Sequence, residues 1–121
     1  MLTVEIKSPH RIEWRNTSRN YHRLGGPAYT VWYHNGQKQC EEYLVDGALH
    51  RLGGPAYTHW YANGQKVSEQ YLVDGVHHRL GGPAVTRWYS NGQKSGEVYW
   101  ENGIRKDHCY YPIRKNDSWL S

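Results

Sequence analysis

The sequence predicts an all-β fold: an antiparallel meander built from three two-stranded repeats that form a single curved sheet, with no major helix. A strict internal repeat is the first observation, because the heptad HRLGGPA occurs at residues 22–28, 50–56 and 78–84. Each repeat also carries two turn signals, and no window shows a helical apolar period with caps. A fixed period of this length indicates an architecture of stacked, similar units.

The repeat divides a chain of 121 residues, enough for one domain, into three parts. The three units are residues 22–49, 50–77 and 78–105. Residues 1–21 are expected to form one or two capping strands, with Ser8-Pro9 as a break. In residues 106–121 we expect a degenerate closing strand, because terminal repeats are often atypical caps. An irregular tail follows from residue 112, and its Trp119 and Leu120 are candidates for docking on the sheet.

The turn signals predict two strands in each repeat. An Asn-Gly pair between aromatic or alternating segments is a strong hairpin signal, because a type I′ turn needs a positive φ at both central residues. These pairs are Asn35-Gly36, Asn63-Gly64 and Asn91-Gly92. A second turn follows in each unit at Asp46-Gly47, Asp74-Gly75 and Asn102-Gly103. Two turns in each period join the strands up and down into a meander.

Alternation along the first strand of each unit predicts which face is buried. Ala28, Thr30 and Trp32 share one face, and the same residue types recur in both later units. We therefore assign this face to the core. The opposite face carries a column that varies between units, as is typical of a solvated or partner-facing column: Val31, His59 and Arg87.

The Gly-Gly-Pro of each heptad comes just before this strand. Proline cannot donate a hydrogen bond to a ladder, and paired glycines allow a bulge or a tight bend. We therefore expect each long strand to be kinked at the heptad. One kink repeated along the sheet would curve the whole sheet into a trough.

Composition indicates a thin, aromatic-rich core and a mild positive charge. Hydrophobic residues make up 37% of the chain and phenylalanine is absent, so six Trp and eleven Tyr must supply much of the buried area. The net charge of +4 allows acidic partners, nucleotides or nucleic acid without requiring them. The chain shows no signal peptide and no apolar run that would span a membrane, and Cys40 and Cys109 match no zinc pattern. We expect a cytoplasmic protein with reduced thiols and no membrane contact.

The phrase WYxNGQKxxExYxxDGxxHRxxGPA resembles the MORN-type repeats, especially their variant form. The resemblance covers roughly residues 20–105 and is carried by Trp32-Tyr33, Asn35-Gly36-Gln37-Lys38, Glu41, Tyr43 and Gly47, with their equivalents in the later units. It implies a solenoid-like β-sheet that binds partners, in some cases lipids and in others further copies of itself. This unit is longer than the usual one, and HRLGGPA replaces a shorter link.

The His-Arg pair of each heptad is the main candidate for ligand contact. The two columns are His22, His50 and His78, and Arg23, Arg51 and Arg79. Because each unit contributes two strands, successive pairs stand about 10 Å apart. This spacing is too wide for one zinc ion and suits an extended chain of carboxylates or phosphates. A purely structural corner is the other interpretation, since no helix N-terminus follows the glycines to complete a phosphate cradle.

Two further columns are candidate contact residues. Tyr33, Tyr61 and Tyr89 could stack bases, as in single-strand nucleic-acid binders, whereas a recurring Glu column dilutes any basic stripe. In the variable column, His59 and Arg87 are expected to face a partner.

No catalytic constellation is recognisable, because no Ser, Cys or Thr stands beside a base and an orienting group. We expect a protein that is not an enzyme and needs no cofactor or metal. The leading hypothesis is protein–protein binding, as a bacterial or phage inhibitor or adaptor that occludes a host complex. The alternative is binding of an anionic ligand, such as a nucleotide, phosphate or single-stranded nucleic acid, by the His-Arg columns. Open edge strands also favour homo-oligomerisation.

Overall fold

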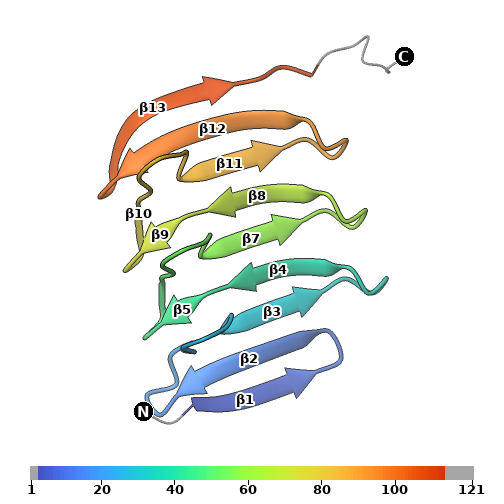
Figure 1. The fold of residues 1–121 in the computed structure, drawn as a ribbon. Helices are drawn as coiled ribbons and strands as arrows, with labels where there is room; N and C mark the ends of the chain where they lie inside the picture. Colours follow the sequence, from blue (N-terminus) through green and yellow to red (C-terminus); the bar gives the residue numbers. More distant parts are fainter. Residues whose placement is uncertain (1–2, 114–121) are drawn as a thin grey trace.

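The computed structural model describes residues 3–113 and confirms the predicted all-β class (Figure 1). These residues form 13 strands and no helix. The strands are β1 (Thr3–Ser8), β2 (Arg11–Asn16), β3 (Tyr29–Trp32), β4 (Lys38–Glu42), β5 (Leu44–Val45), β6 (Ala48–Leu49), β7 (Tyr57–Trp60), β8 (Lys66–Gln70), β9 (Leu72–Val73), β10 (Val76–His77), β11 (Val85–Trp88), β12 (Lys94–Glu101) and β13 (Ile104–Tyr110). Most of the tail predicted from residue 112, including Trp119 and Leu120, lies outside the described residues.

Nine strands form one large antiparallel sheet in the order β1-β2-β3-β4-β7-β8-β11-β12-β13. Figure 1 shows them stacked in chain order from the N-terminal to the C-terminal edge. Each repeat contributes two strands to this sheet, as predicted. The second turns of the first two repeats also close two short ladders outside the sheet, β5–β6 and β9–β10, which the sequence analysis did not predict. In the third repeat, β12 continues through this position and pairs with β13.

Both kinds of turn are present, but the type I′ geometry occurs at Asp-Gly and not at Asn-Gly, for which it was predicted. Asp46 and Gly47 both have positive φ, 49° and 82°, as a type I′ turn requires. At the other turn Gly36 has a φ of 89° but Asn35 has no positive φ. The predicted type I′ turn at Asn-Gly is therefore wrong. The Asn35 side chain accepts a hydrogen bond from Gln37 N at 2.9 Å, which favours a longer loop with only its glycine left-handed.

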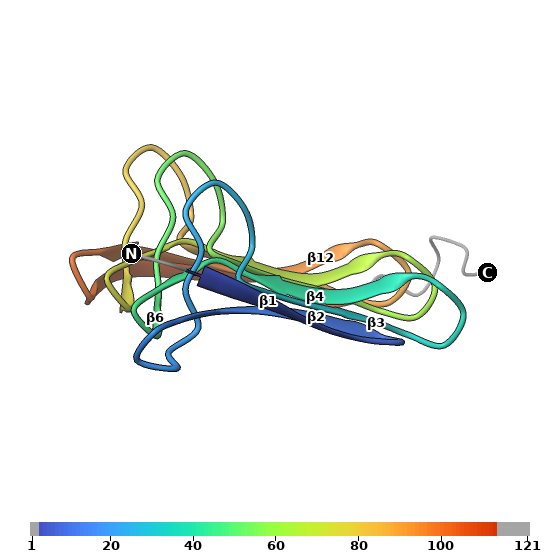
Figure 2. The ribbon, with the colours of Figure 1, turned by 90° about the horizontal axis from the view of Figure 1, so that it is seen from below.

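The heptads form loops that stand out from one side of the sheet. Residues 22–28 lie outside its strands, and β3 begins only at Tyr29. Figure 2 shows three such loops rising from the same side near one end of the strands. The expected kinked strand is therefore wrong. Arg23 N donates to Leu44 O of β5 at 3.1 Å, so this part of the heptad bonds to the short ladder, whereas Ala28 at its end bonds to Glu42 of β4.

Three alanines form the centre of the core where each loop returns to the sheet. Ala28, Ala56 and Ala84 have no exposed surface. The threonines two residues later are also buried, as predicted. The tryptophans expected on the same face are only half-buried, and each follows a register shift in the strand pairing: Trp32, Trp60 and Trp88. Ala56 bonds the strands on both sides, because its N donates to Gln70 O at 2.8 Å and its O accepts from Tyr43 N at 2.7 Å. The centre of the core is therefore a narrow column of small side chains that runs across the three repeats.

The two ends of the sheet are built differently. At the N-terminal end, β1 and β2 pair over six residues and form the predicted capping hairpin. Its Glu13 is 6% exposed and lies 3.0 Å from both Arg11 Nε and Arg15 Nε. At the C-terminal end, the predicted closing strand is present as β13, and every residue of it is exposed.

Candidate functional site

Each heptad arginine has its guanidinium over an aromatic ring. The Cζ atom of Arg51 is 4.0 Å from the centroid of the Tyr43 ring, and Arg79 lies over Tyr71 at the same distance. Arg23 stacks on a residue of the capping hairpin instead, with its Cζ 4.3 Å from the Trp14 ring. Cation–π attraction therefore fixes the position of all three guanidinium groups. The capping hairpin supplies the ring that a preceding repeat would supply.

The two glycines of each heptad serve different purposes. A Cβ atom on Gly54 would lie 2.7 Å from Arg51 Cζ, so a side chain there would displace the guanidinium from its ring. Gly53, in contrast, has open space around it and a φ of 85°, a left-handed conformation that favours glycine. The loop therefore bends at the first glycine and encloses the arginine with the second.

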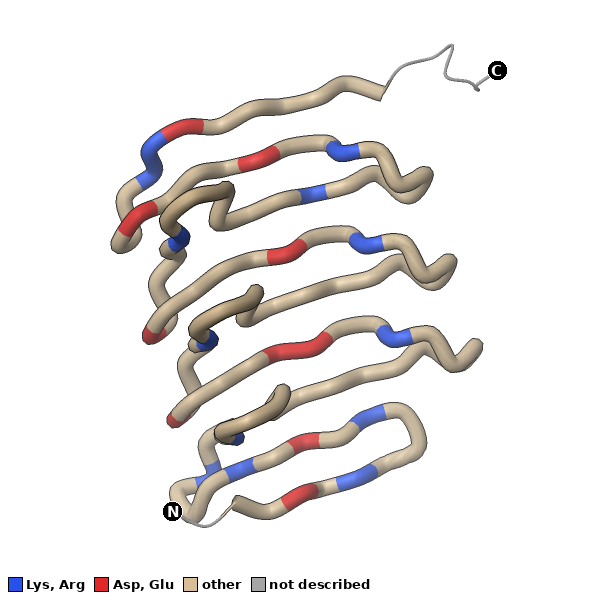
Figure 3. The backbone as a smooth tube through the Cα atoms, in the orientation of Figure 1, with Lys and Arg blue, Asp and Glu red and all other residues tan. Residues whose placement is uncertain are grey.

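No carboxylate among residues 3–113 neutralises these three arginines. None of them takes part in an ion pair of the described residues. Arg51 Nη1 donates to Pro55 O at 3.1 Å, and Arg79 Nη1 donates to Pro83 O at the same distance. Figure 3 shows the basic positions recurring on successive loops. The column therefore carries positive charge and further N–H donors that suit an acidic partner.

The histidine column of the heptads has a structural partner within each repeat. The Nδ1 atoms accept backbone hydrogen bonds from the second turns, at 3.0 Å for Asp46 N to His22, 3.0 Å for Asp74 N to His50 and 2.9 Å for Asn102 N to His78. Each bond ties the start of a repeat to its end. The adjacent His and Arg of the heptad therefore differ in role: the histidine fastens the loop and the arginine carries the free charge.

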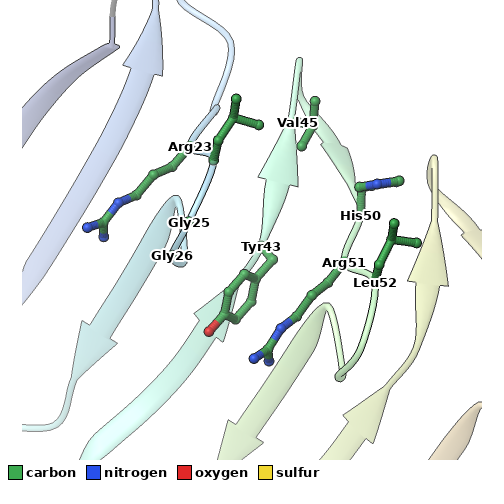
Figure 4. Close-up of a pocket in the computed structure, with 9 residues that line it drawn as sticks. Arg23, Gly25, Gly26, Tyr43, Val45, His50, Arg51 and Leu52 are labelled. Atoms are coloured by element: carbon green, nitrogen blue, oxygen red, sulfur yellow. The ribbon is translucent and has the colours of Figure 1, made fainter.

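Two grooves lie between successive heptad loops, and the sequence analysis did not identify them. The first has a volume of about 430 Å³ and is lined by one loop from Arg23 to Gly26, by the next loop at His50, Arg51 and Leu52, and between them by Tyr43 and Val45. Figure 4 shows Arg51 lying beside the Tyr43 ring in this groove. The second groove, also about 430 Å³, repeats the arrangement one unit later with Tyr71 and Val73. We call them the inter-loop grooves.

The heptad leucines form an exposed row on the loops that flank these grooves. Leu24 and Leu52 are 75% exposed and Leu80 is 70% exposed. We call these three residues the leucine ridge. The signal in the sequence was a leucine in every copy of a glycine-rich loop, where neither turn formation nor strand packing needs one. Exposed apolar groups that gather beside grooves are typical of interaction sites.

The predicted tyrosine column links neighbouring repeats. Tyr33 Oη donates to Trp60 O at 2.7 Å and Tyr61 Oη donates to Trp88 O at 2.9 Å. Tyr89 Oη donates to Tyr111 O at 2.8 Å, beyond the last repeat. The column follows the strand ends opposite the heptad loops (Figure 1), so the structure does not bring it to the inter-loop grooves. Base stacking on these rings stays a prediction.

The variable column lies on the other face of the sheet. His59 pairs with Ser68, which pairs in turn with Arg87, so strand alternation separates both candidates from the face of the buried threonines. Cys40 pairs with His59 across the neighbouring strands. Burial first, and then the nearby carboxylate of Glu42, together raise the pKa of the Cys40 thiol to about 11. The thiol therefore stays protonated near neutral pH and is a poor nucleophile.

Replacing Glu42 on this face with glutamine is expected to stabilise the protein at pH 7. Burial between Tyr29 and Tyr57 of the adjacent strands raises the pKa of Glu42 in the folded protein. The folded state therefore holds the proton of the Glu42 carboxyl group more tightly than the unfolded chain does. The stability that this group contributes is lost as the pH rises through its folded pKa. Thermal melts of Glu42→Gln should show a higher Tm than wild type at pH 7.

The gain from Glu42→Gln should disappear at pH 3, where both states of the wild type are protonated. Glu41→Gln is the matched control one residue away. It removes the carboxylate that lies 2.6 Å from Lys38 Nζ, so no gain is expected at either pH. A lower Tm for Glu42→Gln at pH 7 would contradict the assignment of desolvation as the dominant effect.

Residues 3–113 contain no group of three or more His, Cys, Asp or Glu side chains placed to hold a metal ion. Within the same residues no helix could cross a membrane. A scan against models of protein families, a search of curated proteins and a search of solved structures each found no match for this chain. The MORN-type resemblance therefore stays a prediction, and the function is argued from the geometry of the site.

Proposed function

We propose that this protein is a non-enzymatic binding protein that recognises an extended, acidic segment of another protein. The leucine ridge is the observation that carries the proposal. Complete burial of one leucine side chain is worth about 1.5–3 kcal/mol, and three of them are left 70–75% exposed in a row. They contribute little to folding in this position, whereas a partner that covers them would gain most of this free energy.

The chemistry of the inter-loop grooves supports an acidic partner. Arg51 lines both grooves, and Arg23 and Arg79 line one each. Their guanidinium groups are fixed by stacking and lack a carboxylate among the described residues. A carboxylate that approaches them would form charge-assisted hydrogen bonds with donors already in position, so little side-chain entropy would be lost.

An anionic small ligand is the second candidate, and it is favoured by the three arginines that have no carboxylate partner in the described part of the chain. The grooves, however, combine each arginine with apolar and aromatic groups such as Val45 and Tyr43, which a phosphate alone would leave uncovered. A protein segment would cover both kinds of group. The proposal includes a role as an inhibitor or adaptor that occludes a host complex. That role requires only a binding surface such as the leucine ridge with the inter-loop grooves.

The test is a quantitative pulldown from bacterial lysate with the tagged full-length protein. We expect wild type to capture a protein in stoichiometric amount, and the variant Leu24→Ser/Leu52→Ser/Leu80→Ser to capture at least tenfold less. The three leucines are exposed, so the circular dichroism spectrum and the Tm of this variant should match those of wild type.

The matched control removes three exposed apolar side chains outside the loops, in the variant Val4→Ser/Ile6→Ser/Ile104→Ser. These residues are 58%, 46% and 61% exposed and lie on the two edge strands. Capture should be unaffected by this change. Equal loss in both triple variants, or no stoichiometric partner, would contradict the proposal. Binding of single-stranded DNA that weakens steeply with salt would favour the anionic alternative.

A further inference from the structure

We infer that the bound segment adopts the polyproline II conformation and places one apolar side chain in each inter-loop groove, at every third residue. This inference rests on the proposed function and adds the conformation and register of the partner. It is carried by the period of the two grooves, by their aromatic lining and by the arginine that lies over the tyrosine of each groove.

The period of the grooves follows from the ladder of the sheet. Tyr43 and Tyr71 follow β4 and β8 directly, and β7 is the one strand between these two in the sheet. Strands lie about 4.8 Å apart, so equivalent points of the two grooves are separated by about 9.6 Å. A partner that enters both grooves with equivalent side chains needs a repeat of this length along its own axis.

Polyproline II has the backbone geometry that fits this period best. It has three residues per turn and rises about 3.1 Å per residue, so side chains on one side recur every ~9.3 Å. In a β-strand, same-face side chains recur every ~6.7 Å, which does not match the single period of about 9.6 Å between the two grooves. In an α-helix, side chains seven residues apart lie on the same face and are separated by about 10.5 Å along the axis. The helix diameter of about 10 Å, however, would keep it on the leucine ridge above the grooves.

The lining of the grooves is also suited to this conformation. Tyr43 lines the first groove and Tyr71 the second, with Val45 and Val73 beside them. Aromatic-lined grooves are the usual docking surfaces of polyproline II segments, which bind with a small loss of conformational entropy. The partner backbone would then cross Leu52, which lies on the loop shared by both grooves.

The position of Arg51 adds a requirement for charge. Its guanidinium lies over Tyr43 in the first groove, as that of Arg79 lies over Tyr71 in the second, so each groove places a positive charge beside the side chain that fills it. One of the two residues that connect successive groove-filling side chains should therefore be acidic. The partner pattern is an apolar residue at every third position, with an acidic residue and a proline between.

Fluorescence anisotropy with the full-length protein tests this inference on labelled synthetic peptides. The first probe is the 12-residue peptide (Leu-Pro-Asp)4. The second has the same composition with irregular leucine spacing, the third has lysine in place of aspartate, and the fourth is a Glu/Ala helix with leucine at every seventh residue. We expect the first to bind at least tenfold more tightly than each of the others, and Leu52→Ser to remove this preference.

Equal binding of the regular and irregular peptides, or tighter binding of the helix, would overturn the inference. The same conclusion follows if none of the four peptides binds at millimolar concentration. The pulldown keeps the two claims separate. A captured partner that depends on the leucine ridge, together with failure of the regular peptide, would leave the proposed function intact and reject only the polyproline II conformation.

Discussion

Replacing Ala56 with leucine is expected to lower the free energy of unfolding by about 3 kcal/mol, the upper end of the usual cost of overpacking. Ala56 has no exposed surface, and its backbone bonds the strands on both sides, so it has no direction in which to move. A leucine side chain would push the second heptad loop away from the sheet. In a core this thin, few neighbouring side chains can rearrange to accept the added volume.

Urea denaturation followed by tryptophan fluorescence measures the effect of Ala56→Leu. Ala62→Leu is the matched control, because Ala62 is exposed in the next turn and the same group is added there. Its effect should stay within about 0.5 kcal/mol. A loss below 1 kcal/mol for Ala56→Leu would show that the loop moves freely, and the alanine column would then not be the centre of the core.

Replacing His22 with alanine is expected to cost about 2 kcal/mol of folding stability. His22 is 5% exposed, and its Nδ1 accepts a hydrogen bond from Asp46 N at 3.0 Å. The change removes a buried ring and leaves this backbone N–H without its acceptor. It also releases the start of the first repeat from its end, so the first heptad loop should become more mobile.

Thermal and urea denaturation of His22→Ala, compared with His50→Ala and His22→Asn, identify the cause. The His50 side chain is 25% exposed against 7% for His22, so His50→Ala should cost less. Asparagine can place an oxygen near the position of Nδ1, so His22→Asn should recover part of the loss. If His22→Ala is as stable as wild type but fails to capture the partner, the histidine column contacts the ligand and its structural role is wrong.

The conformation of the heptad could be predicted from the sequence only in part. Its proline and paired glycines correctly indicate a break in strand pairing. They do not distinguish a kinked strand from a protruding loop, because that depends on whether the backbone bonds to the large sheet or to β5. Arg23 N bonds to Leu44 O, a residue 21 positions away, and no local preference encodes this choice.

The type of each turn could not be predicted from the sequence either. Asn-Gly and Asp-Gly are equally good candidates for a type I′ turn on residue type alone. The asparagine side chain bonds its own loop and also donates to the next repeat, from Asn35 Nδ2 to Ala62 O at 2.9 Å. The neighbouring repeat therefore helps to select the wider loop, and the tighter turn occurs at Asp46-Gly47.

The sequence by itself determined the all-β class, the two sheet strands of each repeat and the buried alanine and threonine columns. Each of these follows from turn residues and from alternation with a period of two, which act over a few residues. Only the tertiary structure decided that the histidine fastens each loop while the arginine beside it has no carboxylate partner among residues 3–113, and that Leu24, Leu52 and Leu80 are exposed. The histidine bond joins residues 24 positions apart within one repeat, and the leucines are exposed because the heptad loop stands out from the sheet, so neither outcome follows from preferences that act over a few residues.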